Sequence, residues 1–381
     1  MKYIEEFRNA ELAQGLSRAI SAAVNPQRIY RFMEFCGGHT HAIARYGVED
    51  LLPANVRMIH GPGCPVCVLP VGRVDEAVAL ATQHDVILCT YADLMRVPGT
   101  NYESLIKARS KGADVRMVYS TLDALKIAAD NPDREVVFFA IGFETTTPPT
   151  ASAIKQAQAR GLKNFSVYCN HVLTPAAMRA ILGAYTDEGA PNVILDGFVG
   201  PAHVSAVIGM RPYEEFTRDY KKPVVIAGFE PLDVMQAVLQ LIRQTNDGRA
   251  DVENEYARAV TVEGNLKAQA LTADVFELRD SFEWRGLGAV PFSALQISSE
   301  FASFDAEKRF SVKTPYPKEN KACACGEILR GEKTPTECKI FGTVCTPDNP
   351  MGACMVSSEG ACAAHWTYGR FREAPQMGKS A

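Results

Sequence analysis

The chain has 381 residues, of which 47% are hydrophobic and 22% charged, and its formal net charge at pH 7 is −4. This is the composition of an ordinary globular protein of two or three domains, and the slight negative charge argues against non-specific nucleic-acid binding, which needs a basic surface. No apolar run approaches the roughly 20 residues that span a bilayer, and the first 23 residues have the pattern of an amphipathic helix rather than a signal peptide. We therefore expect a cytoplasmic protein.

Short apolar runs alternate with helix-like stretches from about residue 30 to residue 240. Such alternation indicates βαβ units and a parallel sheet, and uninterrupted apolar runs are typical of strands covered on both faces. The predicted strands span residues 29–35, 56–60, 85–91, 114–119, 135–141, 165–169, 192–198 and 223–229. They can form one sheet or two sheets of four, and residues 131–135 are the best linker candidate between two halves. Ligands of such sheets bind at the carboxyl ends of the strands, so the loops there are candidate sites.

The loop after the first predicted strand has the sequence CGGHTH at residues 36–41. Its glycines permit close backbone approach, and Cys36 would be held at a strand end with two imidazoles in reach. His39 or His41 can orient or deprotonate the thiol, or bind a metal beside it. The alternative is a helix-capping loop whose histidines are incidental.

The loop after the second predicted strand has the sequence GPGCPVC at residues 61–67. A Cys-x-x-Cys pair between a strand and a helix resembles a thioredoxin-type redox site, because a helix N-terminus lowers the pKa of a thiol. Cys64 and Cys67 are therefore candidates for a redox-active pair. The alternative is one half of a zinc site, although no second pair stands at a suitable distance.

Other polar side chains at strand ends are weaker candidates, since each alone is more typical of a helix cap or a salt bridge. They are Asp93, Arg96, Glu144, Thr145, Asn170, His171, His203, Glu230 and Asp233. Cys89 and Cys169 lie inside apolar runs and are expected to be buried as small apolar side chains. A Walker A loop and a complete G-x-G-x-x-G are both absent, so a nucleotide site is not supported.

The segment from 312 to 362 is rich in Pro, Gly, Thr and Cys and needs a covalent or metal staple, because it can bury little surface. It holds six of the eleven cysteines, and in a reducing compartment such cysteines are ligands or catalysts more often than bridges. They are Cys323, Cys325, Cys338, Cys345, Cys354 and Cys362. Their spacing predicts a metal site, iron–sulfur or zinc, without naming the four ligands.

Four motifs in one order resemble the HypD family of hydrogenase maturation factors, and the resemblance covers essentially the whole chain. They are CGGHTH at 36–41, GPGCPVC at 61–67, GFETT at 142–146 and FGTVCTPDNPMGACMVSSEGACAA at 341–364. The resemblance implies an α/β fold with two similar parallel-sheet domains and a third, cysteine-rich domain that holds an iron–sulfur cluster. We place these domains at residues 31–130, 131–240 and 241–381, and we expect the helix within residues 1–30 to pack on the third.

The same resemblance implies a four-iron, four-sulfur (4Fe-4S) cluster and its ligands. The family spacing Cys-x12-Cys-x6-Cys-x16-Cys selects Cys325, Cys338, Cys345 and Cys362, and it leaves the other two cysteines of the segment as non-ligands. The implied task is assembly of the Fe(CN)2CO unit of nickel–iron hydrogenase. HypC would bring the iron, HypE would deliver the cyanide, and this chain would act as a monomer in a complex with HypC, as a redox-active scaffold more than a turnover enzyme.

These implications give roles to the loop residues. Cys36 would bind the iron jointly with a HypC thiolate, and His39 and His41 would tune that thiolate or donate protons. Cys64 and Cys67 would cycle between dithiol and disulfide with electrons from the cluster, or contact iron transiently. Two alternatives remain open from the sequence: a cluster-dependent protein disulfide reductase and a zinc-stapled adaptor.

Overall fold

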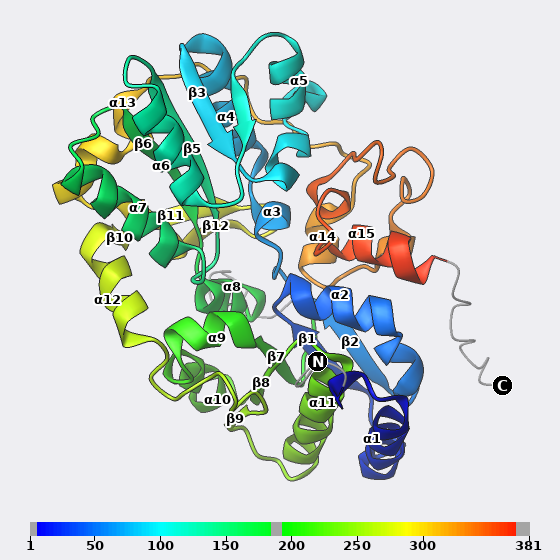
Figure 1. The fold of residues 1–381 in the computed structure, drawn as a ribbon. Helices are drawn as coiled ribbons and strands as arrows, with labels where there is room; N and C mark the ends of the chain where they lie inside the picture. The colour runs from blue at the N-terminus through cyan, green and yellow to red at the C-terminus, as the bar shows by residue number, and fades with distance from the viewer. Residues whose placement is uncertain (1–5, 184–192, 371–381) are drawn as a thin grey trace.

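The computed structural model describes residues 6–183 and 193–370. Figure 1 shows two β-sheets, one in the upper and one in the lower part of the view, with the orange and red C-terminal segment at their right. None of the described helices combines the length and the apolar character that crossing a membrane requires.

Both large sheets are entirely parallel, which confirms the predicted α/β fold class. Sheet A has the strand order β2-β1-β7-β8-β9 and sheet B the order β4-β3-β5-β6. The strands of sheet A are β1 (Tyr30–Glu34), β2 (Val56–His60), β7 (Gly197–Pro201), β8 (Val224–Ala227) and β9 (Val252–Asn254). Those of sheet B are β3 (Val86–Thr90), β4 (Val115–Met117), β5 (Glu135–Gly142) and β6 (Phe165–His171). Two antiparallel ribbons pair β10 (Phe276–Leu278) with β13 (Leu295–Ile297), and β11 (Ser281–Trp284) with β12 (Gly288–Pro291).

The sheets divide the chain differently from the expected boundary at residue 131. The first two strands belong to sheet A, all of sheet B follows, and the chain then returns to complete sheet A. The reason is that β1 pairs with β7 as well as with β2, so its second neighbour comes from a distant part of the sequence. The chain crosses from sheet A to sheet B within residues 61–70, which places the GPGCPVC loop at the crossing.

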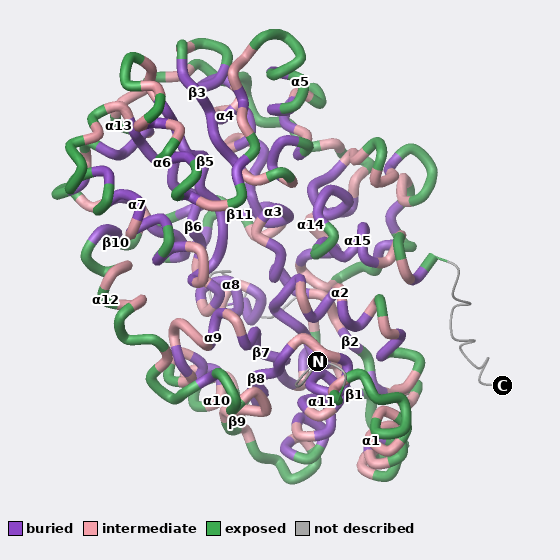
Figure 2. Tube along the Cα trace, viewed as in Figure 1, coloured by how far each residue is buried: buried purple, intermediate pink, exposed green. Residues whose placement is uncertain are grey.

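The helices cover both faces of each sheet. They are α1 (Ala10–Ala23), α2 (Gly37–Tyr46), α3 (Pro65–Val68), α4 (Val71–Gln83), α5 (Leu105–Ser110), α6 (Thr121–Asp130), α7 (Thr147–Ala159), α8 (Thr174–Ile181), α9 (Ala202–Ile208), α10 (Glu214–Arg218), α11 (Pro231–Asn246), α12 (Leu266–Val275), α13 (Ala306–Arg309), α14 (Cys325–Leu329) and α15 (Ala361–Ala364). Short 3-10 turns include η3 (Ala92–Arg96), η4 (Thr100–Tyr102), η5 (Arg211–Tyr213) and η8 (Ala353–Met355). Helices α6 and α7 pack on one face of sheet B and α4 on the other, and the strands of both sheets are mostly buried (Figure 2).

Two expected elements lie elsewhere. The expected strand at 192–198 begins outside the described residues. The observed strand β7 begins only at Gly197 and has the less apolar sequence GFVGP, which is buried, whereas Ile194 is 69% exposed. Helix α1 packs along α11 and not on the cysteine-rich segment, since its apolar face, including the fully buried Ile20, joins the core cluster of α11.

The cysteine-rich segment lies against the helices that follow the two motif loops. Helix α15 contacts α2, whereas α14 and η8 contact α3. Most of its cysteines belong to the same continuous hydrophobic core as one face of each sheet. The three cysteine-bearing motifs are therefore neighbours in space.

Candidate functional site

Cys36 lies between the end of β1 and the start of α2. It is the N-cap residue of α2, with an extended backbone and a side chain that accepts a hydrogen bond from the Gly38 N–H at 3.3 Å. The thiol is 2% exposed. The strand therefore delivers the sulfur to the carboxyl edge of sheet A, and the helix N-terminus holds it there.

Glu34, the last residue of β1, organises this loop, and the sequence analysis did not identify it. Its fully buried carboxylate accepts hydrogen bonds from the Cys36 N–H at 2.8 Å and from the Thr40 hydroxyl, and it contacts His60 Nδ1 at 2.9 Å. A carboxylate at the buried end of a strand was the available signal, because buried carboxylates require partners.

The CGGHTH and GPGCPVC loops touch through their backbones. The Gly37 N–H donates to the Gly63 carbonyl oxygen at 3.1 Å. A Cβ atom on Gly63 would lie 2.2 Å from the Cys36 nitrogen, which no real side chain tolerates. Glycine at this position is thus what allows the two loops to approach so closely.

His203 is the imidazole that contacts the Cys36 thiol. It follows β7, and its Nδ1 lies 3.3 Å from Cys36 Sγ. The ring of Phe229, which follows β8, packs beside it with the centroids 5.4 Å apart. The loops after β1, β2, β7 and β8 therefore converge at one edge of sheet A, and the weak sequence candidate His203 is brought into the site.

The two motif histidines have other contacts. His39 Nε2 contacts the carbonyl oxygens of Ala227 and Gly228 at 3.0 and 2.9 Å, so its N–H anchors α2 to the end of β8. His41 Nδ1 lies 3.4 Å from the carbonyl oxygen of Ser358. Their tuning of a Cys36 thiolate stays a prediction.

The site holds Cys36 and His203 in their neutral forms. Burial raises the pKa of the Cys36 thiol well above its usual value, and the charges of Glu34 and Glu359 raise it further. The hydrogen bond from the Gly38 N–H acts in the opposite direction and lowers this pKa. Burial lowers the pKa of His203 to about 4. At neutral pH the thiol is consequently the natural donor and Nδ1 the natural acceptor of their hydrogen bond.

Cys64 and Cys67 are joined by a disulfide, with 5.2 Å between their Cα atoms. Cys64 caps the N-terminus of α3, where Pro65 is the first helical residue. Cys67 Sγ lies 4.0 Å from the carbonyl oxygen of Ala353, in the cysteine-rich segment. The pair thus stands between the Cys36 loop, which its own loop touches, and the tail.

All six cysteines of the C-terminal segment line one small cavity, together with Ile328, Phe341, Gly352 and Met355. Backbone N–H groups already point at two of the sulfurs, that of Ala324 at Cys338 (3.5 Å) and that of Met351 at Cys345 (3.4 Å). Across residues 6–183 and 193–370, no three His, Cys, Asp or Glu side chains converge closely enough to hold a single metal ion. A ring of thiols around a cavity is a donor set that suits an iron–sulfur cluster, which is held by cysteine thiolates.

The remaining strand-end candidates have local roles. Glu144 accepts from the N–H and hydroxyl of Thr174, at 2.8 and 3.0 Å, and so caps α8, while burial raises the pKa of Glu144 to about 7. His171 Nε2 lies 2.9 Å from the hydroxyl oxygen of Thr150. Three of the other candidates bind arginine side chains: Asp233 accepts from Arg258, Asn170 accepts from Arg73, and Glu230 pairs with Arg8. Arg96 donates to the carbonyl oxygen of Pro347. Burial and the charge of Asp93 raise the pKa of Glu359.

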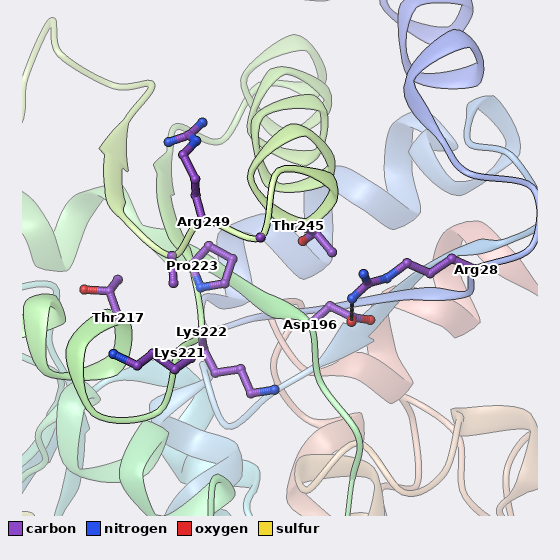
Figure 3. A pocket seen from close by; sticks show the side chains of 10 residues that line it. Arg28, Asp196, Thr217, Lys221, Lys222, Pro223, Thr245 and Arg249 are labelled. Atoms are coloured by element: carbon purple, nitrogen blue, oxygen red, sulfur yellow. Dashed lines mark hydrogen bonds and ion pairs between the residues drawn. The ribbon is translucent and has the colours of Figure 1, made fainter.

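A second cavity, of about 590 Å3, lies near the starts of β7 and β8, away from these loops (Figure 3). Two of its positively charged side chains already have partners: Arg28 pairs with Asp196 at 2.7 Å, and Lys222 donates to the Leu195 carbonyl at 2.6 Å. It contains none of the motif residues.

Comparison with known proteins agrees with these motifs. A profile of the HypD family, described as the hydrogenase formation hypA family, matches residues 11–369. Hydrogenase maturation factor HypD of Rhizobium leguminosarum bv. viciae is 67% identical over 373 residues, which are 98% of this chain and 97% of that protein. The HypD proteins of Cupriavidus necator and Escherichia coli K12 are 66% and 46% identical, over 98% and 97% of this chain and 99% and 98% of theirs. This chain belongs to the HypD family of hydrogenase maturation factors.

Proposed function

We propose that this chain is the scaffold on which the Fe(CN)2CO unit of nickel–iron hydrogenase is assembled, with Cys36 as its iron ligand. The observation that carries the proposal is the contact between the buried Cys36 thiol and the neutral His203 imidazole. Low-spin iron with carbon monoxide and cyanide ligands is soft, and a thiolate suits it.

Iron binding must remove the Cys36 proton, because burial keeps the thiol protonated at neutral pH. Fe(II) would replace that proton on sulfur, and the released proton would pass by way of Nδ1 of His203, which lies 3.3 Å away, to solvent, because the low pKa of His203 leaves its ring neutral at neutral pH. The new thiolate–iron bond compensates the cost of a buried negative sulfur. We assign a second thiolate ligand of the iron to the partner HypC. It would not enter beside Gly37 or Gly38, where an added Cβ atom would lie 2.3 Å from Glu359 and 2.8 Å from Phe229.

The cysteine-rich segment is proposed to hold a 4Fe-4S cluster on Cys325, Cys338, Cys345 and Cys362. When bound, such a cluster supplies electrons one at a time. The Cys64–Cys67 disulfide takes up two electrons and two protons and becomes two thiols. Its position beside the tail supports this order of transfer. HypE, as the cyanide donor, completes the proposed set of partners.

Substitution of Cys36 tests this proposal. We expect Cys36→Ala to lose co-purification with HypC, and to lose bound iron that shows cyanide infrared bands. Cys89→Ala is the matched control, because Cys89 is fully buried in sheet B. Cys36→Ala protein that keeps both the partner and the bands would exclude Cys36 as the ligand.

A second candidate is a cluster-dependent protein disulfide reductase, favoured by the Cys64–Cys67 disulfide beside the tail. It gives no role to Cys36 or to His203. If Cys36→Ala left a reductase activity intact and hydrogenase maturation unimpaired, this second function would replace the first.

A further inference from the structure

Two adjoining cavities form a groove on the surface next to the cysteine-rich segment. They measure about 530 and 150 Å3 and share Pro98, Tyr102 and Met351 in their walls. Ile106 and Pro350 extend the apolar part of the larger one. Tyr102 is 43% exposed and Ile106 49%, so this groove presents large apolar side chains to solvent.

The wall between this groove and the cysteine cavity is thin. Met351 lines the groove, while its N–H donates to Cys345 Sγ at 3.4 Å. The next residue, Gly352, lines the cysteine cavity, and a Cβ atom on it would lie 2.4 Å from Cys323 Sγ. A molecule seated in the groove is therefore separated from the cysteines by little more than one residue.

The rim of the groove carries uncompensated positive charge. Arg96 and Lys107 donate only to the carbonyl oxygens of Pro347 and Tyr102, and Lys318 lies on the smaller cavity. Over the described ranges 6–183 and 193–370, none of these three cations forms an ion pair. The opposing charges in the walls are Asp348 and Glu319, and Glu319 is already paired with Arg285 at 2.7 Å.

We propose that this groove is the docking surface for an acidic protein electron carrier that reduces the cluster. The inference rests on the proposed function, since it requires the cluster there. In each encounter the carrier loses one electron and the cluster gains one. Two encounters, with two protons from solvent, convert the Cys64–Cys67 disulfide into two thiols. An apolar floor with a basic rim suits a small, transient and salt-sensitive electron-transfer interface.

Charge reversal on the rim tests the proposal, with a dithionite-reduced acidic two-iron ferredoxin as the probe. We expect Arg96→Glu/Lys107→Glu to slow bleaching of the cluster near 400 nm by about tenfold at low salt, and the difference to vanish at high salt. Binding of oxidised ferredoxin to chains with and without the cluster is the second readout, and it should weaken by a similar factor. Lys221→Glu, in the cavity of Figure 3, is the control and should change neither value more than about twofold.

The outcomes separate docking from the cluster itself. If the double variant were reduced by ferredoxin as fast as the parent chain and bound it equally well, the docking site would be wrong. The proposed function would still stand in that case, provided that dithionite alone bleaches the cluster. A chain without a cluster to bleach would overturn both. Loss of HypC co-purification without any change in ferredoxin binding would assign the groove to HypC instead. Should the double variant fail to fold, Lys318→Glu alone is the replacement. It should slow bleaching by ferredoxin and weaken ferredoxin binding by a few-fold.

Discussion

The Cys36 thiol and the His203 imidazole form a neutral pair, which in the proposed function would become reactive only when iron arrives. A thiol whose pKa is raised by burial has little thiolate at neutral pH, and thiolate is the form that reacts with oxidants. Bound iron would supply the positive charge that makes deprotonation of the thiol favourable. The arrangement thus links the reactivity of the sulfur to the arrival of its ligand.

His203→Gln should slow iron loading, because glutamine keeps a polar side chain beside the sulfur but accepts no proton at neutral pH. We expect Fe(II) uptake to be about tenfold to a hundredfold slower, and its pH dependence to change. Rapid-mixing measurement of iron uptake checks this. His84→Gln is the control, since His84 contacts the carbonyl of Ser311 and the ring of Phe310, away from Cys36. Equal rates in both variants would remove His203 from the proton transfer.

His171 gives a pH effect on stability that is separate from the site. Burial lowers its pKa from 6.5 to about 4, so the unfolded chain takes up this proton below pH 6.5 and the folded chain only near pH 4. The free energy of unfolding should fall by about 3 kcal/mol across that window, at ~1.4 kcal/mol for each pKa unit. His171→Gln should lose this part of the fall. The free energy of unfolding, measured in urea between pH 4 and 7, checks this. The same pH dependence in the variant and the parent would contradict the assignment.

At the residue scale the sequence singled out Cys36, Cys64 and Cys67 as candidates, because cysteine in a glycine-rich loop is distinctive, and their chemical roles stay predictions. It did not identify Glu34 or Glu359, because single carboxylates are common and only the fold shows that these act on one thiol. It ranked His203 below the motif histidines, since its contact with Cys36 depends on the pairing of β7 with β1.

At the scale of elements, the site depends on loops packed so closely that one methyl group matters. Gly63 and Cys36 belong to loops after neighbouring strands, and their backbones are in direct contact. The register Glu34 to His60 places the ends of β1 and β2 side by side. Strand pairing therefore sets the separation of the Cys36 loop and the Cys64–Cys67 loop.

Gly63→Ala should separate these two loops, since its Cβ would lie 2.2 Å from the Cys36 nitrogen. We expect a loss of stability of about 1–3 kcal/mol, and loss of iron binding. Gly15→Ala in α1 is the matched control, because nothing lies within 4 Å of its Cβ, and it should stabilise by about 0.5–1 kcal/mol. Melting curves and iron content measure both, and a Gly63→Ala protein with normal iron content would show that the loops need not touch.

The sequence predicted most strands because their apolar, β-branched runs differ from their surroundings. It misplaced the seventh, since GFVGP has little strand propensity and is a strand only because sheet A buries it on both sides. It also misplaced the packing of α1, because an apolar helix face shows that a helix packs but not on which partner.

At the scale of the whole molecule, the interleaved sheets bring together what the chain keeps apart. Residues 61–70 cross between the sheets, and the tail lies against that crossing. The thiol, the disulfide and the six-cysteine cavity therefore form a continuous series, which local sequence patterns cannot predict. We propose that electrons pass along this series from the cluster to the Cys64–Cys67 disulfide, beside the Cys36 loop.

The alkylation state of Cys64 and Cys67, followed while the cluster is reduced, tests that claim most directly. We predict that both thiols become alkylated in step with cluster reduction in the parent chain. In the Cys338→Ser variant, dithiothreitol should still reduce the disulfide and allow both thiols to be alkylated. An electron donor that acts only through the cluster should not. Alkylation that is the same whether or not the cluster is reduced would contradict the account.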